Sequence, residues 1–218
     1  MPFGAFIGFI MALDNYANLK ASVASWSHRE DVGGLIDDFI LLAETEFYTG
    51  NEAQIRTRDM IVTETSTTVA DSRFQALPTN YLEMRSFKID TAGRLRSLYY
   101  KTPEQLPIFD TSGDPCYYTI TSQIEYDAPA ADTYATSIMH YAKLTALSAS
   151  NTTNAILTKY PTVYLYGCLW ALNQWAVDAE EEAKYYTKFI KAIAGANSSD
   201  NDGLLGIGAQ KTVRGRNP

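Results

Sequence analysis

The sequence predicts an α+β fold: a helical bundle from N- and C-terminal helices, an inserted antiparallel β subdomain, and an extended C-terminal arm. Three observations support this class. Apolar residues recur at helical spacing over residues 14–59 and 145–196, which are predicted to form the bundle. Over residues 60–144 the pattern changes to short runs that favour strands, so this stretch is the predicted β insertion. Beyond residue 196 the sequence becomes polar and then glycine-rich, and residues 197–218 are the predicted arm.

The composition favours a folded chain with a protein-binding role. With 46% hydrophobic and 20% charged residues, the 218-residue chain can form a sizeable core. A net charge of −7 argues against a general nucleic-acid binder, but leaves open a protein that lines a DNA passage with a negative wall. The 15 tyrosines are typical of interfaces. Cys116 and Cys168 suit a reducing compartment and lack metal-ligand spacing, with a disulfide between them as the less favoured alternative.

Residues 1–13 form an apolar N-terminal extension outside the helical pattern. The run is too short to span a bilayer and lacks the basic region and cleavage site of a secretory signal. Two interpretations remain: an extended interaction arm, or upstream sequence before a start at Met11. We favour the start at Met11, because sequence typical of a folded protein begins immediately after it.

Two helices are expected in the N-terminal part of the bundle. The first is expected over residues 14–27, with Asp14 as its N-cap. The second is expected to begin after Glu30 or Asp31 and to break at residues 49–51, with a shorter helical piece beyond the break. Their apolar faces are expected to contain Leu19, Val23 and Trp26 in the first helix, and Val32, Leu35, Ile36, Phe39, Ile40, Ala43 and Phe47 in the second.

The β insertion is expected to consist of strands joined by short turns. The strands are expected at residues 60–70, 72–77, 81–90, 94–100, 116–121, 123–127 and 133–144. A turn at 91–93 joins two of them as a hairpin, and a proline at the first helical position predicts a short helix over 102–106. The candidate inward residues of the third strand are Leu82, Met84, Phe87 and Ile89.

Two more helices are expected in tandem near the C-terminus. Residues 160–172 are apolar on almost every side, which predicts a helix buried at the centre of the bundle. Residues 180–194 carry a single apolar stripe opposite lysines and glutamates, which predicts a helix with one wet face. This stripe consists of Ala183, Tyr186, Ile190 and Ile193. Asn151 or Asn154 is expected to start a short helix that leads into the pair.

The sequence shows no pattern typical of a catalytic or ligand-binding site. Its two histidines are His28 and His140, and we interpret His140 as an ordinary strand residue. No Cys/His cluster has zinc spacing, and residues 203–208 lack the Lys-Ser/Thr end of a phosphate-binding loop. The three glutamates at 180–182 are interpreted as favourable charges at a helix N-terminus. We therefore predict no catalytic, cofactor-binding or metal-binding residue, no cofactor, and no enzyme activity.

The C-terminal arm is the candidate partner-binding segment. Apolar side chains on an exposed arm reduce solubility unless a partner covers them, and glycines let an arm lie closely along another backbone. A frayed terminus is the simpler alternative, and we favour partner docking. The candidate docking residues are Leu204, Leu205, Ile207, Lys211, Val213, Arg214 and Arg216.

Several segments in succession carry a family resemblance. They are residues 16–29, 36–40, 42–46, 56–60, 77–85 (which begin Leu77-Pro78-Thr79-Asn80-Tyr81), 147–154 and 159–167 (which begin Lys159-Tyr160-Pro161-Thr162-Val163). Their order and spacing resemble the head-to-tail adaptor (connector) proteins of tailed bacteriophages over about residues 16–193. The chain departs from the family pattern at 47–53, where it is longer, and in its first ten residues.

The resemblance implies a non-catalytic structural protein of the virion neck, assembled in the host cytoplasm. It implies a homo-oligomeric ring, expected to be a dodecamer, that docks beneath the portal protein and extends the DNA channel. The ring would offer a platform to tail or nozzle proteins, with the C-terminal arm gripping the portal. DNA would only pass through without specific contacts, and no membrane is involved.

Two other functions remain open from the sequence. One is a tail-completion or terminator protein, which would be a virion protein of similar size placed elsewhere in the particle. The other is a soluble binding module whose β insertion holds a small ligand. An adaptor is expected to assemble with portal rings, whereas either alternative is expected to ignore them.

Overall fold

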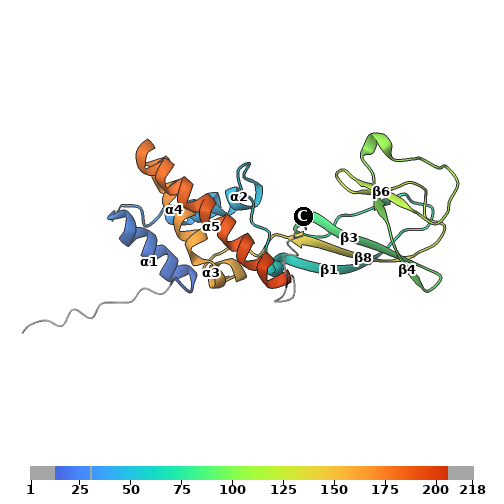
Figure 1. The fold of residues 1–218 in the computed structure, drawn as a ribbon, viewed down its shortest axis with the longest axis horizontal. Coiled ribbons are helices and arrows are strands. Elements are labelled where there is room, and N and C mark those ends of the chain that lie inside the picture. The colour runs from blue at the N-terminus through green and yellow to red at the C-terminus, as the bar shows by residue number, and fades with distance from the viewer. Residues whose placement is uncertain (1–12, 30, 206–218) are drawn as a thin grey trace, which may run out of the picture. The chain divides into compact units, whose positions relative to one another are not determined.

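The computed structural model describes residues 13–29 and 31–205, with side chains through Asp200. These residues form two compact units. Residues up to Thr57 together with those from Leu144 form a helical unit, and Arg58–Lys143 form a β unit. Figure 1 shows the helices grouped in one unit and the strands in the other. The predicted α+β class with an inserted, largely antiparallel β subdomain is confirmed.

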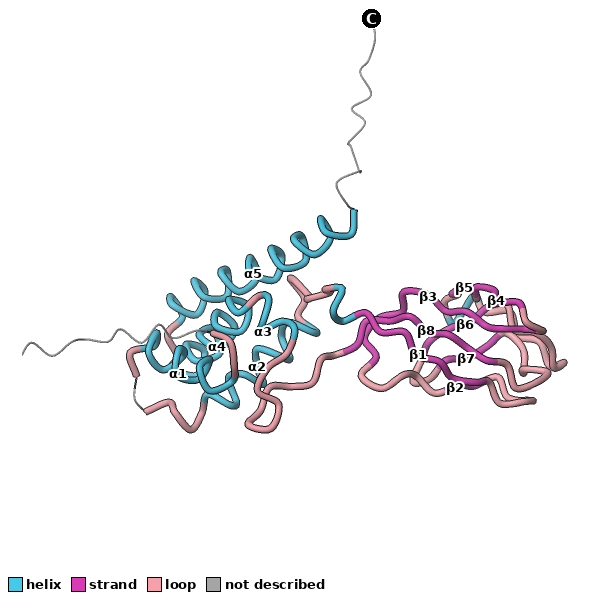
Figure 2. Tube along the Cα trace, turned by 90° about the horizontal axis from the view of Figure 1, so that it is seen from below, coloured by secondary structure: helices cyan, strands magenta, loops and turns pink. Residues whose placement is uncertain are grey.

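The helical unit is built around one central helix. Its helices are α1 (Tyr16–Ser27), α2 (Ile36–Thr49), α3 (Ala155–Lys159), α4 (Pro161–Trp175) and α5 (Ala179–Leu205). Helix α4 packs against each of the other four helices, and Figure 2 shows it lying among them. Most of its residues are buried, which confirms the prediction for the apolar stretch. Pro161 occupies the first turn, where the missing N–H leaves no helical hydrogen bond unmade.

The start of α1 differs from the prediction by one residue. Asn15, not Asp14, is the N-cap, because its side-chain oxygen accepts a hydrogen bond from the backbone N–H of Asn18 at 2.9 Å. Asp14 instead accepts from the side-chain amide of Asn18 at 2.6 Å. The helix ends at His28, which adopts the left-handed conformation with φ of 52°. Such a residue closes a helix by turning the chain away from it.

Helix α2 is shorter than predicted at its start. Residues 31–35 form turns, and the helix begins at Ile36 rather than at Val32. Gly33 and Gly34 lie in this stretch, and each is less favourable in a helix than alanine by about 1 kcal/mol. The predicted break at 49–51 is confirmed, since α2 ends at Thr49.

The segment after α2 is not helical, so the predicted short helical piece there is wrong. Its backbone hydrogen bonds go to other elements instead. The N–H of Ile55 donates to the carbonyl of Phe47 at 2.8 Å, and the N–H of Arg56 donates to the side chain of Asn197 at 2.8 Å. These tertiary bonds hold the segment between α2 and α5 in place of a local helical ladder.

Helix α5 is longer than predicted and buries a different stripe. Its buried residues are Phe189, Ile193, Ala196 and Asp200. Of the predicted stripe, Ile193 is buried, Tyr186 and Ile190 are half-buried, and Ala183 is exposed. The helix continues to Leu205, so the predicted start of an extended arm at residue 197 is wrong. The helix continues because residues beyond 196 still contact the rest of the unit: Asp200 is buried, and the side-chain amide of Asn197 donates to the carbonyl of Gln54 at 2.8 Å.

Three helices come closest at Gly167 of α4. A Cβ atom at this position would lie 2.8 Å from the Cβ of Ala43 in α2 and 2.9 Å from the Cε2 of Phe189 in α5. Both distances are shorter than carbon atoms in contact adopt. The absence of a side chain at Gly167 therefore allows α2 and α5 to pack on the same turn of α4.

The β unit contains two four-stranded sheets. Its elements are η1 (Arg58–Met60), β1 (Ile61–Thr67), β2 (Phe74–Gln75), β3 (Tyr81–Thr91), β4 (Arg94–Ser97), β5 (Tyr99–Tyr100), η2 (Pro103–Gln105), β6 (Tyr117–Ile120), β7 (Ile124–Tyr126) and β8 (Ala135–Ala142). One sheet has the strand order β1-β8-β3-β4 and the other β2-β7-β6-β5. Neighbouring strands are antiparallel, except that β5 and β6 are parallel.

The chain changes sheets at Leu98, inside the stretch predicted as one strand over 94–100. The N–H of Leu98 donates to the carbonyl of Phe87 in the first sheet, whereas the N–H of Tyr99 donates to the carbonyl of Cys116, next to the second. Leu98 is buried in the core that both sheets share. Its burial there pins the crossing point between the two sheets.

The core of the β unit lies between the two sheets. It consists of Phe87, Ile89, Leu98, Tyr118, Ile124, Tyr126 and Ile138. Of the predicted inward residues, Phe87 and Ile89 are buried, and Leu82 and Met84 are half-buried. The pairing of β3 with β8 shifts between Met84 and Ser86. Such an irregularity exchanges the two faces of a strand, which is why the even-numbered and odd-numbered residues do not share one face.

Among the described helices, none is both long enough and apolar enough to cross a membrane.

The first prediction concerns the close approach at Gly167. We expect Gly167→Ala to lower the free energy of unfolding by about 1–3 kcal/mol, because the added methyl group overpacks the contact between α2, α4 and α5. Thermal or denaturant unfolding of the full chain measures this loss.

Gly195 provides a matched control in α5. A Cβ there would meet no atom within 4 Å, so Gly195→Ala is expected to stabilise the protein by about 0.5–1 kcal/mol through helix propensity. Equal effects of the two substitutions would contradict the packing explanation.

Candidate functional site

Only two of the predicted docking residues fall on an element of the structure. Leu204 and Leu205 are the last residues of α5. The others, Ile207, Lys211, Val213, Arg214 and Arg216, lie outside the described residues. Their role in docking stays a prediction.

A buried polar network in the helical unit escaped the sequence reasoning. Its centre is Glu44 of α2, which is 6% exposed. One Glu44 oxygen accepts hydrogen bonds from the N–H of Leu147 at 3.0 Å and from the hydroxyl of Tyr164 at 2.8 Å. The Tyr164 oxygen in turn accepts from the side-chain amide of Asn154 at 2.6 Å, and Asn154 is the N-cap of α3. The network thus joins α2 and α4 to the segment that returns from the β unit.

A second tyrosine ties the same segment to α2. The hydroxyl of Tyr48 accepts from the N–H of Leu144 at 3.0 Å. Tyr48 and Glu44 lie one helical turn apart, so both grip the returning segment from one face of α2. The backbone of residues 144–147 is therefore held by side-chain acceptors, because it lies outside any helix or sheet.

Burial controls the ionisation of this network. It raises the pKa of the Glu44 carboxyl, although the hydrogen bonds from Leu147 and Tyr164 oppose that shift. Burial also raises the pKa of Tyr48 to about 12 and, with the nearby Glu44 charge, raises the pKa of Tyr164. The tyrosines therefore stay protonated at neutral pH and act as donors or fixed acceptors. The arrangement positions the backbone and holds the helices in register.

His140 is a buried strand residue of β8, which fits its interpretation from the sequence. Its side chain is fully buried, and neither ring nitrogen has a hydrogen-bond partner in the described part of the chain. The nearest carboxylate oxygen, on Glu64, lies 3.7 Å from Nε2, and the ring of Tyr81 packs against the imidazole at 5.6 Å between centroids.

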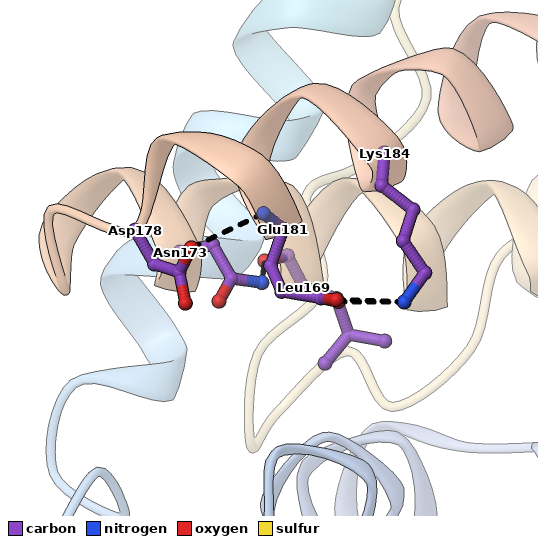
Figure 3. A network of polar contacts seen from close by, with 5 residues as sticks. All are labelled: Leu169, Asn173, Asp178, Glu181 and Lys184. Carbon is purple, nitrogen blue, oxygen red and sulfur yellow. Dashed lines mark hydrogen bonds and ion pairs between the residues drawn. The ribbon is translucent and has the colours of Figure 1, made fainter.

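A cavity of about 460 Å³ opens in the helical unit between α1, α4 and the start of α5. Its wall includes Trp26, Arg29, Asn173, Glu181 and Tyr185. The lining residues Leu169, Asn173, Asp178 and Glu181 already make polar contacts, and Figure 3 draws these residues with Lys184. These contacts are bonds from Lys184 to both carboxylate oxygens of Glu181 at 2.7 and 2.9 Å, from the N–H of Glu181 to Asp178 at 3.2 Å, and from the side chain of Asn173 to the carbonyl of Leu169 at 2.8 Å.

The glutamates at 180–182 lie in the first turn of α5, as predicted. Their charges face the positive end of the helix dipole, which stabilises the helix start. Within the described residues, no group of three or more His, Cys, Asp or Glu side chains is placed to hold a metal ion.

Both units expose large apolar side chains. In the helical unit these are Trp26, Leu41, Leu42, Trp175 and Val177, and in the β unit Val62, Val69, Phe74, Leu95, Tyr99, Tyr100, Ile108, Phe109 and Met139. Exposed apolar side chains mark a partner site where they gather into a contiguous patch. The sequence pattern did not predict which apolar side chains are exposed, except that Leu41 and Leu42 fall outside the predicted apolar stripe of α2.

The described residues thus show a helical bundle with a buried polar network, and two units that expose apolar side chains. Comparison with known families gives the class of protein. Residues 14–210 match the family model described as SU10 adaptor protein. Because the match covers most of the chain, the protein belongs to this phage adaptor family. A search of curated proteins finds no match. Family membership implies a structural role in the virion and contacts with other virion proteins.

The second prediction concerns Glu44. The pKa of Glu44 is raised in the folded state above its ordinary value of 4.5. Its contribution to stability is therefore complete below pH 4.5 and is lost as the pH rises through the folded-state pKa. We therefore expect wild type to lose more stability than Glu44→Gln between about pH 4.5 and pH 7. Denaturant unfolding of both proteins across this range measures the difference.

Asp37 of α2 provides a control of opposite sign. Its pKa is lowered by hydrogen bonds from Lys20 and Tyr16, so its contribution is lost as pH falls below its ordinary value of 3.8. The difference in the free energy of unfolding between wild type and Asp37→Asn should therefore become smaller at acid pH. If the free energy of unfolding of Glu44→Gln changed with pH in parallel with that of wild type, the raised pKa of Glu44 in the folded state would be contradicted.

Proposed function

We propose that this protein is a head-to-tail connector that forms a homo-oligomeric ring, expected to be a dodecamer, beneath the portal of the phage head. The ring extends the DNA channel and presents a platform to the next tail component. The single observation that carries this proposal is the adaptor family match over residues 14–210. The chain would be assembled in the host cytoplasm and remain in the virion neck.

The charge of the chain supports a passive DNA channel. A net charge of −7 gives a wall that repels the DNA backbone, so that DNA passes without sticking. A protein that grips DNA would need a basic surface to neutralise phosphates. DNA is therefore a passing molecule in this proposal and not a bound ligand.

The portal is the proposed partner of the C-terminal arm. Helix α5 runs to Leu205, so Leu204 and Leu205 end a helix immediately before the remaining arm residues. Residues Ile207 and Val213 supply apolar contacts, and Lys211, Arg214 and Arg216 supply positive charge. A segment of this composition suits docking along another protein, where glycines allow close backbone contact.

The β unit is the proposed contact for tail or nozzle proteins. Tyr99, Tyr100, Ile108 and Phe109 are all more than half exposed. Large aromatic side chains in such positions are favoured at interfaces, because they bury much area at little entropic cost. The surface would be covered only after the ring has docked on the head.

The third prediction tests the ring itself. We expect purified full-length protein to assemble to a ring-sized mass when mixed with isolated portal rings, because repeated contacts on a template lower the entropic cost of association. Native mass spectrometry or analytical ultracentrifugation, with and without portal, measures the mass. A chain that stays monomeric and ignores portal rings would contradict the connector proposal and leave both alternatives, a terminator protein and a ligand-binding module.

The fourth prediction tests the arm. Deleting residues 206–218 is expected to abolish co-sedimentation with portal rings and to leave the thermal unfolding of the chain unchanged, since the described helices remain complete. A charge-reversed triple variant, with Lys211, Arg214 and Arg216 each changed to Glu, separates the charged from the apolar contribution. If the truncated chain still sediments with portal, residues 206–218 do not carry the docking.

A further inference from the structure

Charges are segregated between two helices of the helical unit. Helix α2 (Ile36–Thr49) contains four carboxylates and no lysine or arginine. In contrast, the middle of α5, over residues 183–199, contains three lysines and no acidic residue. In a chain of net charge −7, this basic stretch stands apart from its surroundings. Surfaces of opposite sign on one subunit are complementary in a head-to-tail contact between identical copies.

The exposed side of α2 combines acid with apolar surface. We define the α2 leucine face as Asp38, Leu41, Leu42 and Thr45. Leu41 and Leu42 are 59% and 45% exposed, whereas the opposite side of α2 is buried. Asp38 has no ion-pair partner among the described residues, whereas the neighbouring Asp37 is engaged by Lys20 at 2.6 Å.

The opposite charge lies along the seam between α1 and α5. We define the α1–α5 seam as Trp26, Tyr166, Tyr185, Lys188 and Lys191. The rings of Trp26 and Tyr166 pack edge to face at 6.4 Å, and Tyr166 packs on Tyr185 at 6.5 Å. Trp26 nevertheless stays 49% exposed. The seam is thus an aromatic strip that runs from α1 over Tyr166 of α4 to α5.

Two lysines of the seam are available to a partner. The Lys188 ammonium lies over the rings of Tyr185 and Tyr166, at 4.9 and 5.6 Å from their centroids. These contacts hold the ammonium on the strip and reduce the entropy lost on binding. Lys184 is already paired with Glu181, but neither Lys188 nor Lys191 has a carboxylate partner in the part of the chain that the structure describes.

The two surfaces face different sides of the bundle. On α5, Tyr185 and Lys188 point toward α1 through Tyr166, whereas the adjacent Tyr186 points toward α2 and bonds Glu46 at 3.2 Å. The α2 leucine face lies beyond that contact, on the side of α2 turned away from its buried residues. One chain therefore cannot close the two surfaces on each other.

We propose that a second copy of this chain docks its α2 leucine face on the α1–α5 seam. The leucines cover the exposed aromatic strip, and Asp38 meets Lys188 and Lys191. Because two different surfaces meet, the contact is head-to-tail, and such contacts form a ring when the rotation closes. This inference rests on the proposed ring and names the surfaces through which its subunits touch.

A charge swap tests the contact in the full chain mixed with portal rings. Lys188→Glu and Asp38→Lys are each expected to weaken ring assembly by about tenfold or more, because like charges then meet across the interface. The double variant should recover most of the loss, since the pair is restored in reverse. Lys88→Glu, at an exposed position of β3, is the matched control and should assemble like wild type. Thermal unfolding of each variant identifies any that fails to fold.

Cross-linking gives a readout that does not depend on affinity. In a Cys116→Ser background, which leaves only the buried Cys168, the pair Leu41→Cys and Tyr185→Cys should give a ladder of linked chains with a bis-maleimide. Each single-cysteine variant should give none, because each surface meets the other and not itself.

The outcomes separate this inference from the proposed function. A ring of normal mass without a ladder, or a double charge variant no better than the singles, would show that the subunits touch elsewhere and would overturn the inference while leaving the ring intact. A chain that stays monomeric with portal rings would overturn both. A ladder together with recovery in the double variant would support the inference.

Discussion

The helical unit depends on the close approach of three helices at Gly167. Because this position of α4 has no side chain, Ala43 of α2 and Phe189 of α5 can both press against the same turn. Packing at interior density leaves no room to shift one helix without the other two. The placement of α2 and α5 against α4 therefore depends on this contact.

The Glu44 network adds direction to that packing. A buried carboxylate must keep its hydrogen-bond donors, so the network adds a directional constraint to the apolar contacts. Glu44, Tyr164 and Asn154 therefore fix α2, α4 and the start of α3 in one register. The backbone that returns from the β unit is held by Glu44 at Leu147 and by Tyr48 at Leu144. A large insertion can thus be carried without loosening the bundle.

The sequence could predict the features that depend on neighbouring residues. The apolar stretch of α4, the break after Thr49 and the Asn154 cap all have local signals, and the structure agrees with them. Features that depend on distant residues were missed. The helix continues through Asn197 because its side chain meets Gln54 and Arg56, more than a hundred positions away. Likewise, the two faces of β3 exchange at an irregularity that alternation cannot reveal. The network around Glu44 joins residues that only the fold brings together.

The close packing at Gly167 and the hydrogen-bond network around Glu44 affect how a ring of such subunits could close. In a head-to-tail contact, the rotation from one subunit to the next is fixed by the angle between the two docking surfaces. Here one surface is carried by α2 and the other by α5 with α1, and all three helices pack on α4. In the proposed ring, the angle would therefore depend on the packing inside the subunit, at Gly167 and around Glu44, as well as on the contact itself. A small change in packing there would be repeated at every subunit, so ring symmetry would be sensitive to residues that touch no partner.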